Sequence, residues 1–306
     1  MRLRGIVVSQ EHGFSDNLKS FLFKEGLREI LLDRDPKTIL NVIDRGDWPA
    51  VFIDCSEGSP HPFLVHDLYH STIGLELCSY FYVLPESSGA LFQEGIQNGA
   101  LDCWKRPIKP MESTASLKKH FLTEHEKVLS IALQASKQLM QGDLKAAYGL
   151  LLNLRTHQSF QVRADIALAR CEYRSGLLAR SLERLKKVQE SGGPLTRVAK
   201  EISNAYAHFS MVEESLNALM EIPLETPNHC VFSIVEKQME LGKFSEALDS
   251  LLLVQGDTHL GKTANEYLVR ILTLLGLQNY ISQIVKLSPV QLKKTLAQLG
   301  PTHKGA

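Results

Sequence analysis

An aspartate stands directly behind an apolar run that predicts a buried strand, since Asp54 follows Ala50–Ile53. Arg106 comes two residues after a later run, Leu101–Trp104, and is itself followed by a proline. A carboxylate at the end of a strand can accept hydrogen bonds from local backbone amides and can pair with a guanidinium group. We therefore expect Asp54 to bond its local backbone and to face Arg106.

Two histidines four residues apart, His66 and His70, would share one face of a helix, with His61 nearby. Imidazoles at this spacing can bind a metal together, but no cysteine or carboxylate completes a recognisable ligand spacing. Cys55 has no histidine paired with it in the sequence and is expected to be a buried structural residue. The chain also lacks Gly-x-Ser-x-Gly, Walker and dinucleotide-binding motifs. We expect no metal site, no cofactor and no catalytic residues, and so no enzyme.

Five short apolar runs alternate with helical patterns in the first third of the chain. They lie at residues 5–8, 29–32, 50–53, 80–83 and 101–104. Most of these runs are apolar on both faces, which is typical of a parallel sheet covered by helices on two sides. Between them, Ser15 and Asp35-Pro36 are candidate helix starts. The pattern predicts an α/β domain.

Residues 3–122 resemble the receiver domain of bacterial response regulators. The residues that carry the resemblance are Asp54, Asn98–Asp102 and Arg106-Pro107. The resemblance implies a five-stranded, doubly wound parallel sheet with Asp54 in the place of the phosphoryl-accepting aspartate. It also implies an acidic pair after the first strand, because magnesium takes hard oxygen ligands beside that aspartate.

The sequence departs from the receiver pattern at most of these chemical positions. The acidic pair is replaced by Ser9 and Gln10, and the hydroxyl residue expected at the end of the fourth strand is Leu84 or Pro85. The lysine expected before the proline is Arg106. We therefore predict a pseudo-receiver whose altered pocket is formed by Ser9, Gln10 and Arg106.

Two alternatives stay open for this pocket. Asp54 could be a working phosphoacceptor, which would make the protein a phosphorylation-switched regulator. The pocket near Ser9, Asp54 and Arg106 could instead hold a nucleotide, which would make the protein a small-molecule sensor. Uptake of beryllofluoride with magnesium would separate the first from the adaptor role proposed below, and a thermal-shift screen with nucleotides the second.

The second part of the chain repeats one turn at nearly constant spacing. The turn residues are Gly142, Gly176, Ser210, Gly242 and Gly276, which are separated by 34, 34, 32 and 34 residues. Apolar residues three and four apart precede and follow each turn, which predicts pairs of amphipathic helices. A single pair cannot bury both apolar faces, so the pairs must stack.

This 34-residue period resembles the tetratricopeptide (TPR) repeat. Small residues stand at the position after the turn where the TPR pattern has alanine, namely Ala147, Ser181, Ser215 and Ala247. The resemblance implies an α-solenoid of about five hairpins whose first helices line a concave groove.

The TPR register assigns eight residues to this partner-binding groove. They are Arg163, Arg170, Tyr173, Arg174, Arg197, Asn204, His208 and Arg270. Arginine forks bind carboxylates in a bidentate manner, and an asparagine can hold a peptide backbone. We expect a partner segment that carries acidic residues or a free C-terminal carboxylate. The alternative is that the arginines pair with Asp165, Glu172 and Glu201 on a solvated face.

Composition places bounds on the class of protein. The 306 residues carry 34 basic and 34 acidic side chains, which argues against nucleic-acid binding through bulk charge. No apolar run approaches the length of a membrane span, so we expect no membrane insertion. The five cysteines show no paired spacing and are expected to be reduced, as in a cytoplasmic protein.

These observations predict a receiver-like domain at residues 1–122 and a TPR-like domain at 123–300, with no flexible linker between them. The second domain would end in a capping helix that starts at Ser288, and residues 301–306 would form a tail. The predicted function is a non-catalytic bacterial signalling adaptor that binds a protein through its groove, its receiver face or both. The receiver face could also form a homodimer.

Overall fold

The computed structural model describes residues 2–9, 11–32, 35–55, 62–85, 89–122, 124, 126–222, 230–254 and 261–277. The chain forms two compact units, Met1–Phe209 and Ser210–Ala306, and each is treated by itself below. Among the described residues, no helix has both the length and the apolar character needed to cross a membrane.

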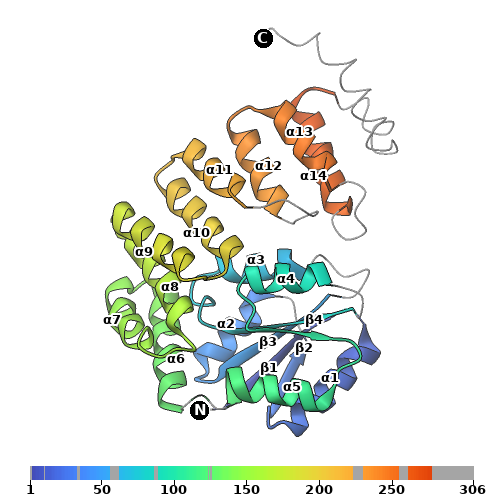
Figure 1. The fold of residues 1–306 in the computed structure, drawn as a ribbon, viewed down its shortest axis with the longest axis vertical. Helices are drawn as coiled ribbons and strands as arrows, with labels where there is room; N and C mark the ends of the chain where they lie inside the picture. The colour runs from blue at the N-terminus through green and yellow to red at the C-terminus, as the bar shows by residue number, and fades with distance from the viewer. Residues whose placement is uncertain are drawn as a thin grey trace. The chain divides into compact units, whose positions relative to one another are not determined.

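A five-stranded parallel sheet organises the first unit (Figure 1). Its strands are β1 (Leu3–Val8), β2 (Glu29–Leu32), β3 (Trp48–Asp54), β4 (Ser79–Leu84) and β5 (Asp102–Lys105). All neighbouring pairs are parallel and the order is β2-β1-β3-β4-β5, which is a doubly wound arrangement with its switch point between β1 and β3. β3 and β4 are buried along their whole length, as the apolar runs predicted.

Five helices cover the two faces of this sheet. They are α1 (His12–Lys24), α2 (Pro36–Asp44), α3 (Pro62–Ser71), α4 (Gly89–Gln97) and α5 (Pro110–Leu117). Figure 1 shows α1 and α5 on one face and α2, α3 and α4 on the other, as right-handed crossovers require. Trp104 of β5 packs on Phe21 of α1 and donates a hydrogen bond to Ser116 of α5, while Tyr80 of β4 packs on His66 of α3.

The two predicted helix starts have different outcomes. Asp35 accepts a hydrogen bond from the Lys37 amide ahead of α2, with Pro36 at the first position, so this start is confirmed. The prediction for Ser15 was wrong, because α1 begins at His12 and Ser15 lies inside it. The Ser15 hydroxyl donates to the Glu11 carbonyl four residues back, which is the interior use of serine in a helix.

Helical hairpins follow the sheet, after a short π-helical segment, Lys118–Leu122. The first unit contains α6 (Glu126–Met140), α7 (Leu144–Leu154), α8 (Gln161–Arg174), α9 (Leu178–Glu190) and α10 (Leu195–His208). The second unit contains α11 (Val212–Met220), α12 (Cys230–Glu240), α13 (Phe244–Leu252) and α14 (Gly261–Leu274). The expected fold class, a doubly wound parallel sheet followed by helical repeats, is confirmed.

Side chains at the repeat positions behave as the pattern predicted. The small residues after four of the turns, Ala147, Ser181, Ser215 and Ala247, are each fully buried. In the α6–α7, α8–α9 and α12–α13 hairpins this allows the two helices to approach closely. The second half of the fifth repeat, the capping helix from Ser288 and the tail lie outside the described residues.

One continuous apolar core joins the sheet to α6, α7 and α8 within the first unit. The ring of Trp48 at the start of β3 lies 6.2 Å from that of Phe160, just before α8. Gly74, in the loop after α3, has Met140 of α6 against it so closely that a Cβ would meet the Met140 Cγ at 2.6 Å. The sheet and the first helices are therefore packed as one body.

Candidate functional site

Asp54 lies at the carboxyl end of β3, between the ends of β1 and β4, which is the edge where ligands bind in doubly wound sheets. Its side chain is fully buried. The Ser9 hydroxyl donates a hydrogen bond to Asp54 Oδ2 at 2.6 Å. Arg106 Nη2 lies 2.5 Å from Asp54 Oδ1 and forms an ion pair with it. The structure thus brings together three of the four predicted pocket residues, and Gln10 lies outside the described residues.

Arg106 is also held by Glu11 and Phe14. Its Nη1 atom donates to Glu11 Oε2 at 2.5 Å, and its guanidinium carbon lies 3.6 Å from the centre of the Phe14 ring. Both oxygens of Asp54 are therefore engaged by the chain's own side chains, and a phosphoryl group would have to displace Ser9 or Arg106. Burial raises the pKa of the neighbouring Cys55 thiol well above its usual value, so that this group stays protonated.

The histidines of α3 serve as core residues. The His66 and His70 rings lie 4.0 Å apart, with His66 Nδ1 hydrogen-bonded to the Tyr82 hydroxyl and His70 Nδ1 3.2 Å from Glu76 Oε2. Within the part of the chain that the structure describes, no three histidine, cysteine or acidic side chains are placed to hold a metal ion. His61 is not among the described residues.

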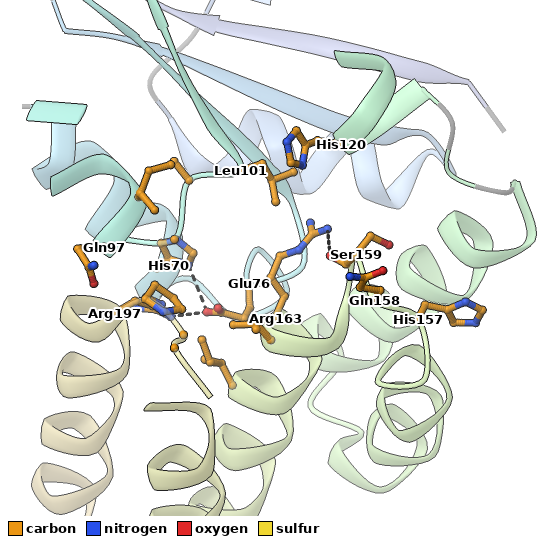
Figure 2. A pocket seen from close by; sticks show the side chains of 18 of the residues that line it. His70, Glu76, Gln97, Leu101, His120, His157, Gln158, Ser159, Arg163 and Arg197 are labelled. Carbon is orange, nitrogen blue, oxygen red and sulfur yellow. Dashed lines mark hydrogen bonds and ion pairs between the residues drawn. The ribbon is translucent and has the colours of Figure 1, made fainter. Parts of the chain in front are cut away.

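Arg170 of α8 and Arg197 of α10 do not face an open groove, contrary to the prediction. Both are nearly fully buried and bind the same two carboxylates, Glu76 from the loop before β4 and Glu201 of α10 (Figure 2 shows Arg197 on Glu76). Arg170 Nη2 lies 3.1 Å from Glu76, and Arg197 Nη2 lies 2.8 Å from Glu201. The prediction of solvent-facing arginines is thus corrected for both residues, because the loop before β4 covers this part of the helices.

The four side chains balance two positive charges with two negative ones. Burial opposes the charge on Glu201, but Arg170 and Arg197 outweigh it and hold the pKa of this carboxyl below its usual value. Breaking one member of such a group would leave an unpaired buried charge, which costs about 3–5 kcal/mol. The cluster is thus a structural link between the sheet and the helices.

Arg163 of α8 also faces inward, contrary to the groove prediction. Its Nη1 atom donates to the carbonyl oxygens of Leu77 at 2.6 Å and Cys78 at 3.1 Å. Its Nη2 atom donates to the carbonyl oxygen of Ser159 at 2.9 Å (Figure 2). The side chain also lies over the Phe160 ring, 4.1 Å from its centre. Arg163 therefore caps backbone carbonyls of the sheet domain.

The rest of the predicted groove stays near the surface. Arg174 at the end of α8 and Asn204 and His208 of α10 are exposed, while Tyr173 is buried with its ring 5.5 Å from that of His208. In the second unit, Arg270 of α14 is exposed. A partner can thus reach Arg174, Asn204 and His208 in the carboxyl-terminal halves of α8 and α10, whereas Arg163 and Arg197 in the first turns are buried.

Two acidic residues that bind these helices were missed from the sequence. Glu76 holds Arg170 and Arg197, and both oxygens of Asp67 accept from Lys200 Nζ at 2.6 Å. The available signal was Glu76 itself, a lone carboxylate inside the apolar run Ile73–Cys78, which had to find a cationic partner if buried.

The carboxylates proposed as alternative partners are used differently as well. Asp165 and Glu172 pair with Arg155 at the end of α7 and with Arg180 and Arg184 of α9 rather than with the groove arginines. Arg184 alone reaches both, at 2.8 Å to Asp165 Oδ1 and 2.8 Å to Glu172 Oε1. Only Glu201 binds the arginines for which it was considered.

Comparisons with known proteins add little to this picture. No protein-family model matches the chain, and no curated protein matches it. Among solved structures the chain is similar to one described as MamA MSR-1 C2, with 17% identity, a TM-score of 0.34, and coverage of 56% of this chain and 99% of that one. It is also similar to full-length FixJ from B. japonicum, with 15% identity, a TM-score of 0.30, and coverage of 71% of this chain and 95% of that one. TM-scores this low support no argument, so the fold assignment rests on the strand order and the hairpins themselves.

Proposed function

We propose that this chain is a non-catalytic signalling adaptor, in which a receiver-like domain is joined to TPR-like repeats and binds another protein. The observation that carries the proposal is the arrangement at Asp54, whose two oxygens are occupied by Ser9 and Arg106. A phosphoacceptor needs an open carboxylate with metal ligands beside it. Here the carboxylate stabilises the edge of the sheet.

The partner-binding surface is the exposed end of α8 and α10, formed by Arg174, Asn204 and His208. A cation next to an amide and an imidazole suits a peptide with an acidic side chain or a terminal carboxylate. A second surface is the receiver-like face of α4, β5 and α5, where a homodimer would form. The amino end of α10 reaches one end of α4, since the Leu195 amide donates to Gln97 there.

The test is affinity capture with the full-length protein and a variant that carries Arg174→Ala and Asn204→Ala. We expect a captured protein to bind at least tenfold more weakly to this variant. Both side chains are exposed, so their loss should leave the fold intact, whereas Arg170→Ala would unbalance the buried charges. Asn153→Ala with Lys186→Ala, which removes the same residue classes from other exposed positions, is the matched control.

Equal capture by both variants would show that the binding site lies elsewhere than at Arg174 and Asn204.

The arrangement at Asp54 has its own test, a thermal-shift measurement with magnesium and beryllofluoride. We expect these reagents to leave the melting temperature of the parent protein unchanged, and likewise that of the Asp54→Asn variant. A shift that requires Asp54 would contradict the adaptor proposal in favour of a phosphorylation switch.

A further inference from the structure

A cavity of about 790 Å³ lies at the amino ends of β4 and β5, between the sheet and the first turns of α8 and α10 (Figure 2). It is at the opposite edge of the sheet from Asp54, and its volume is within the range of small-molecule sites. Its apolar wall comprises Ile96, Leu101, Val162, Ile166 and Pro194. Its basic side chains are His70, Lys119, His120, His157, Arg163 and Arg197, and its two carboxylates are Glu76, which is paired with Arg170 and Arg197, and Glu124.

Arg163 brings a positive charge to this cavity that no side chain neutralises by contact. It is 8% exposed, and among the described residues no carboxylate lies within ion-pair distance of it. Glu124 and Glu76 favour its charge only from farther away, and burial lowers the pKa of Arg163 to about 10. The carbonyl oxygens that bind its Nη atoms satisfy hydrogen bonds but carry no net charge, so the positive charge of Arg163 is not cancelled by contact and favours an anion nearby.

Two buried guanidinium N–H donors at the cavity lack hydrogen-bond partners among the described residues. They are Arg163 Nε and Arg197 Nε. Both side chains are more than nine-tenths buried and line the cavity. Because buried donors rarely stay unpaired, an acceptor placed in the cavity would gain these interactions.

The helices around the cavity add positive potential. α8 and α10 both begin at its wall, and their N-cap residues, Phe160 and Pro194, provide no side-chain acceptor. At the start of α10 the Leu195 amide donates to the neutral side chain of Gln97, which leaves the charge of the helix start uncompensated. The first amides of a helix carry a partial positive charge and often bind anions. Two helix starts and an unneutralised guanidinium group therefore act in the same direction.

We propose that this cavity binds a small organic anion, with an oxyanion head on Arg163 and the helix starts and an apolar body against Leu101, Val162 and Ile166. This ligand site is separate from the protein-binding surface at Arg174 and does not depend on it. The apolar wall distinguishes the proposed ligand from inorganic phosphate.

The experiment uses the full-length protein and 8-anilinonaphthalene-1-sulfonate, a fluorescent anion with an apolar body. We expect saturable binding, at least tenfold weaker binding to Arg163→Gln, and loss of binding to Val162→Trp, which fills the cavity without removing charge. Octanoate should displace the dye at far lower concentration than octanol or inorganic phosphate.

Because Arg163 also holds backbone carbonyls, circular dichroism must show that each variant is folded, and Lys119→Gln gives a second charge variant at an exposed position. Lys145→Gln, on α7 away from the cavity, should bind as the parent does. Unchanged binding by folded Val162→Trp would overturn the proposal. Displacement by octanol as strong as by octanoate would overturn its anionic part.

Discussion

His66 and His70 of α3 are buried bases that lie among other charged groups. Burial lowers the pKa of both imidazoles well below the usual value. The positive charges of Arg197 and Arg170 lower the pKa of His70 further. The carboxylates of Asp67 and Glu201 raise this pKa, but by less than burial and the arginines lower it. Both rings are therefore neutral in the folded protein at neutral pH.

This neutrality predicts an acid-sensitive fold. Below about pH 6.5 the unfolded chain binds protons at these histidines while the folded chain does not, so the free energy of unfolding falls as the pH falls. The slope is about 1.4 kcal/mol per pH unit for each histidine. We expect urea unfolding between about pH 5 and pH 8 to show it.

His70→Gln should reduce the change in the free energy of unfolding per pH unit by the contribution of one histidine. His208→Gln, at an exposed position, should leave this pH dependence unchanged. An identical pH slope in His70→Gln and the parent would show that the buried imidazole is not the source.

At the scale of elements, the hairpin turns share one backbone conformation. Gly142, Gly176, Gly242 and Gly276 have φ between 71° and 84°, and Ser210 has φ 58°. Glycine adopts this left-handed region freely, whereas a residue with a Cβ does so at a cost of about 1–2 kcal/mol. Among the described residues Ser210 is the only non-glycine with positive φ.

Ser210→Gly should therefore raise the free energy of unfolding by about 1 kcal/mol, because the strain at Ser210 exceeds the extra chain entropy of glycine. Ser191→Gly is the matched control, since Ser191 also ends a helix but has φ −81°. We expect thermal unfolding to show a higher midpoint for the first variant and an equal or lower one for the second. A lower midpoint for Ser210→Gly would contradict the strain.

Elements were predictable because their signals are local. Apolar runs located all five strands, and the turn spacing located the hairpins, including the one at Ser210 where glycine is absent. The start of α1 was missed because serine can either cap a helix or bond back inside one, and the residue type does not choose between them.

At the scale of the molecule, the groove was only partly predictable. The repeat register assigned Arg163, Arg170 and Arg197 to one helix face, but it could not show that the loop before β4 covers that face. Glu76 is 94 residues from Arg170 and 121 from Arg197, and a single sequence carries no signal for pairs at such separations. By contrast, Ser9, Asp54 and Arg106 were found together because strand ends in a parallel sheet meet at one edge.

The predicted domain boundary after residue 122 can be tested by truncation. A fragment of residues 1–122 would leave Glu76 and Asp67 without their partners on α8 and α10 and would expose Trp48, which packs on Phe160. We expect residues 1–209 to unfold cooperatively with a native near-ultraviolet spectrum, and residues 1–122 to lack both properties. If the two fragments were equally stable, the sheet would be an independent domain.

The link between Glu76 and Arg197 also has a consequence for biosynthesis. Glu76 leaves the ribosome 121 residues before Arg197. At ordinary rates of synthesis this interval takes about 6–24 s. Until α8 emerges this carboxylate lacks both of its arginines, and until α10 emerges it lacks Arg197. Contacts this distant in sequence slow folding, because the loop must close before the contact forms. The nascent sheet is therefore the stage at which this protein most needs chaperone protection.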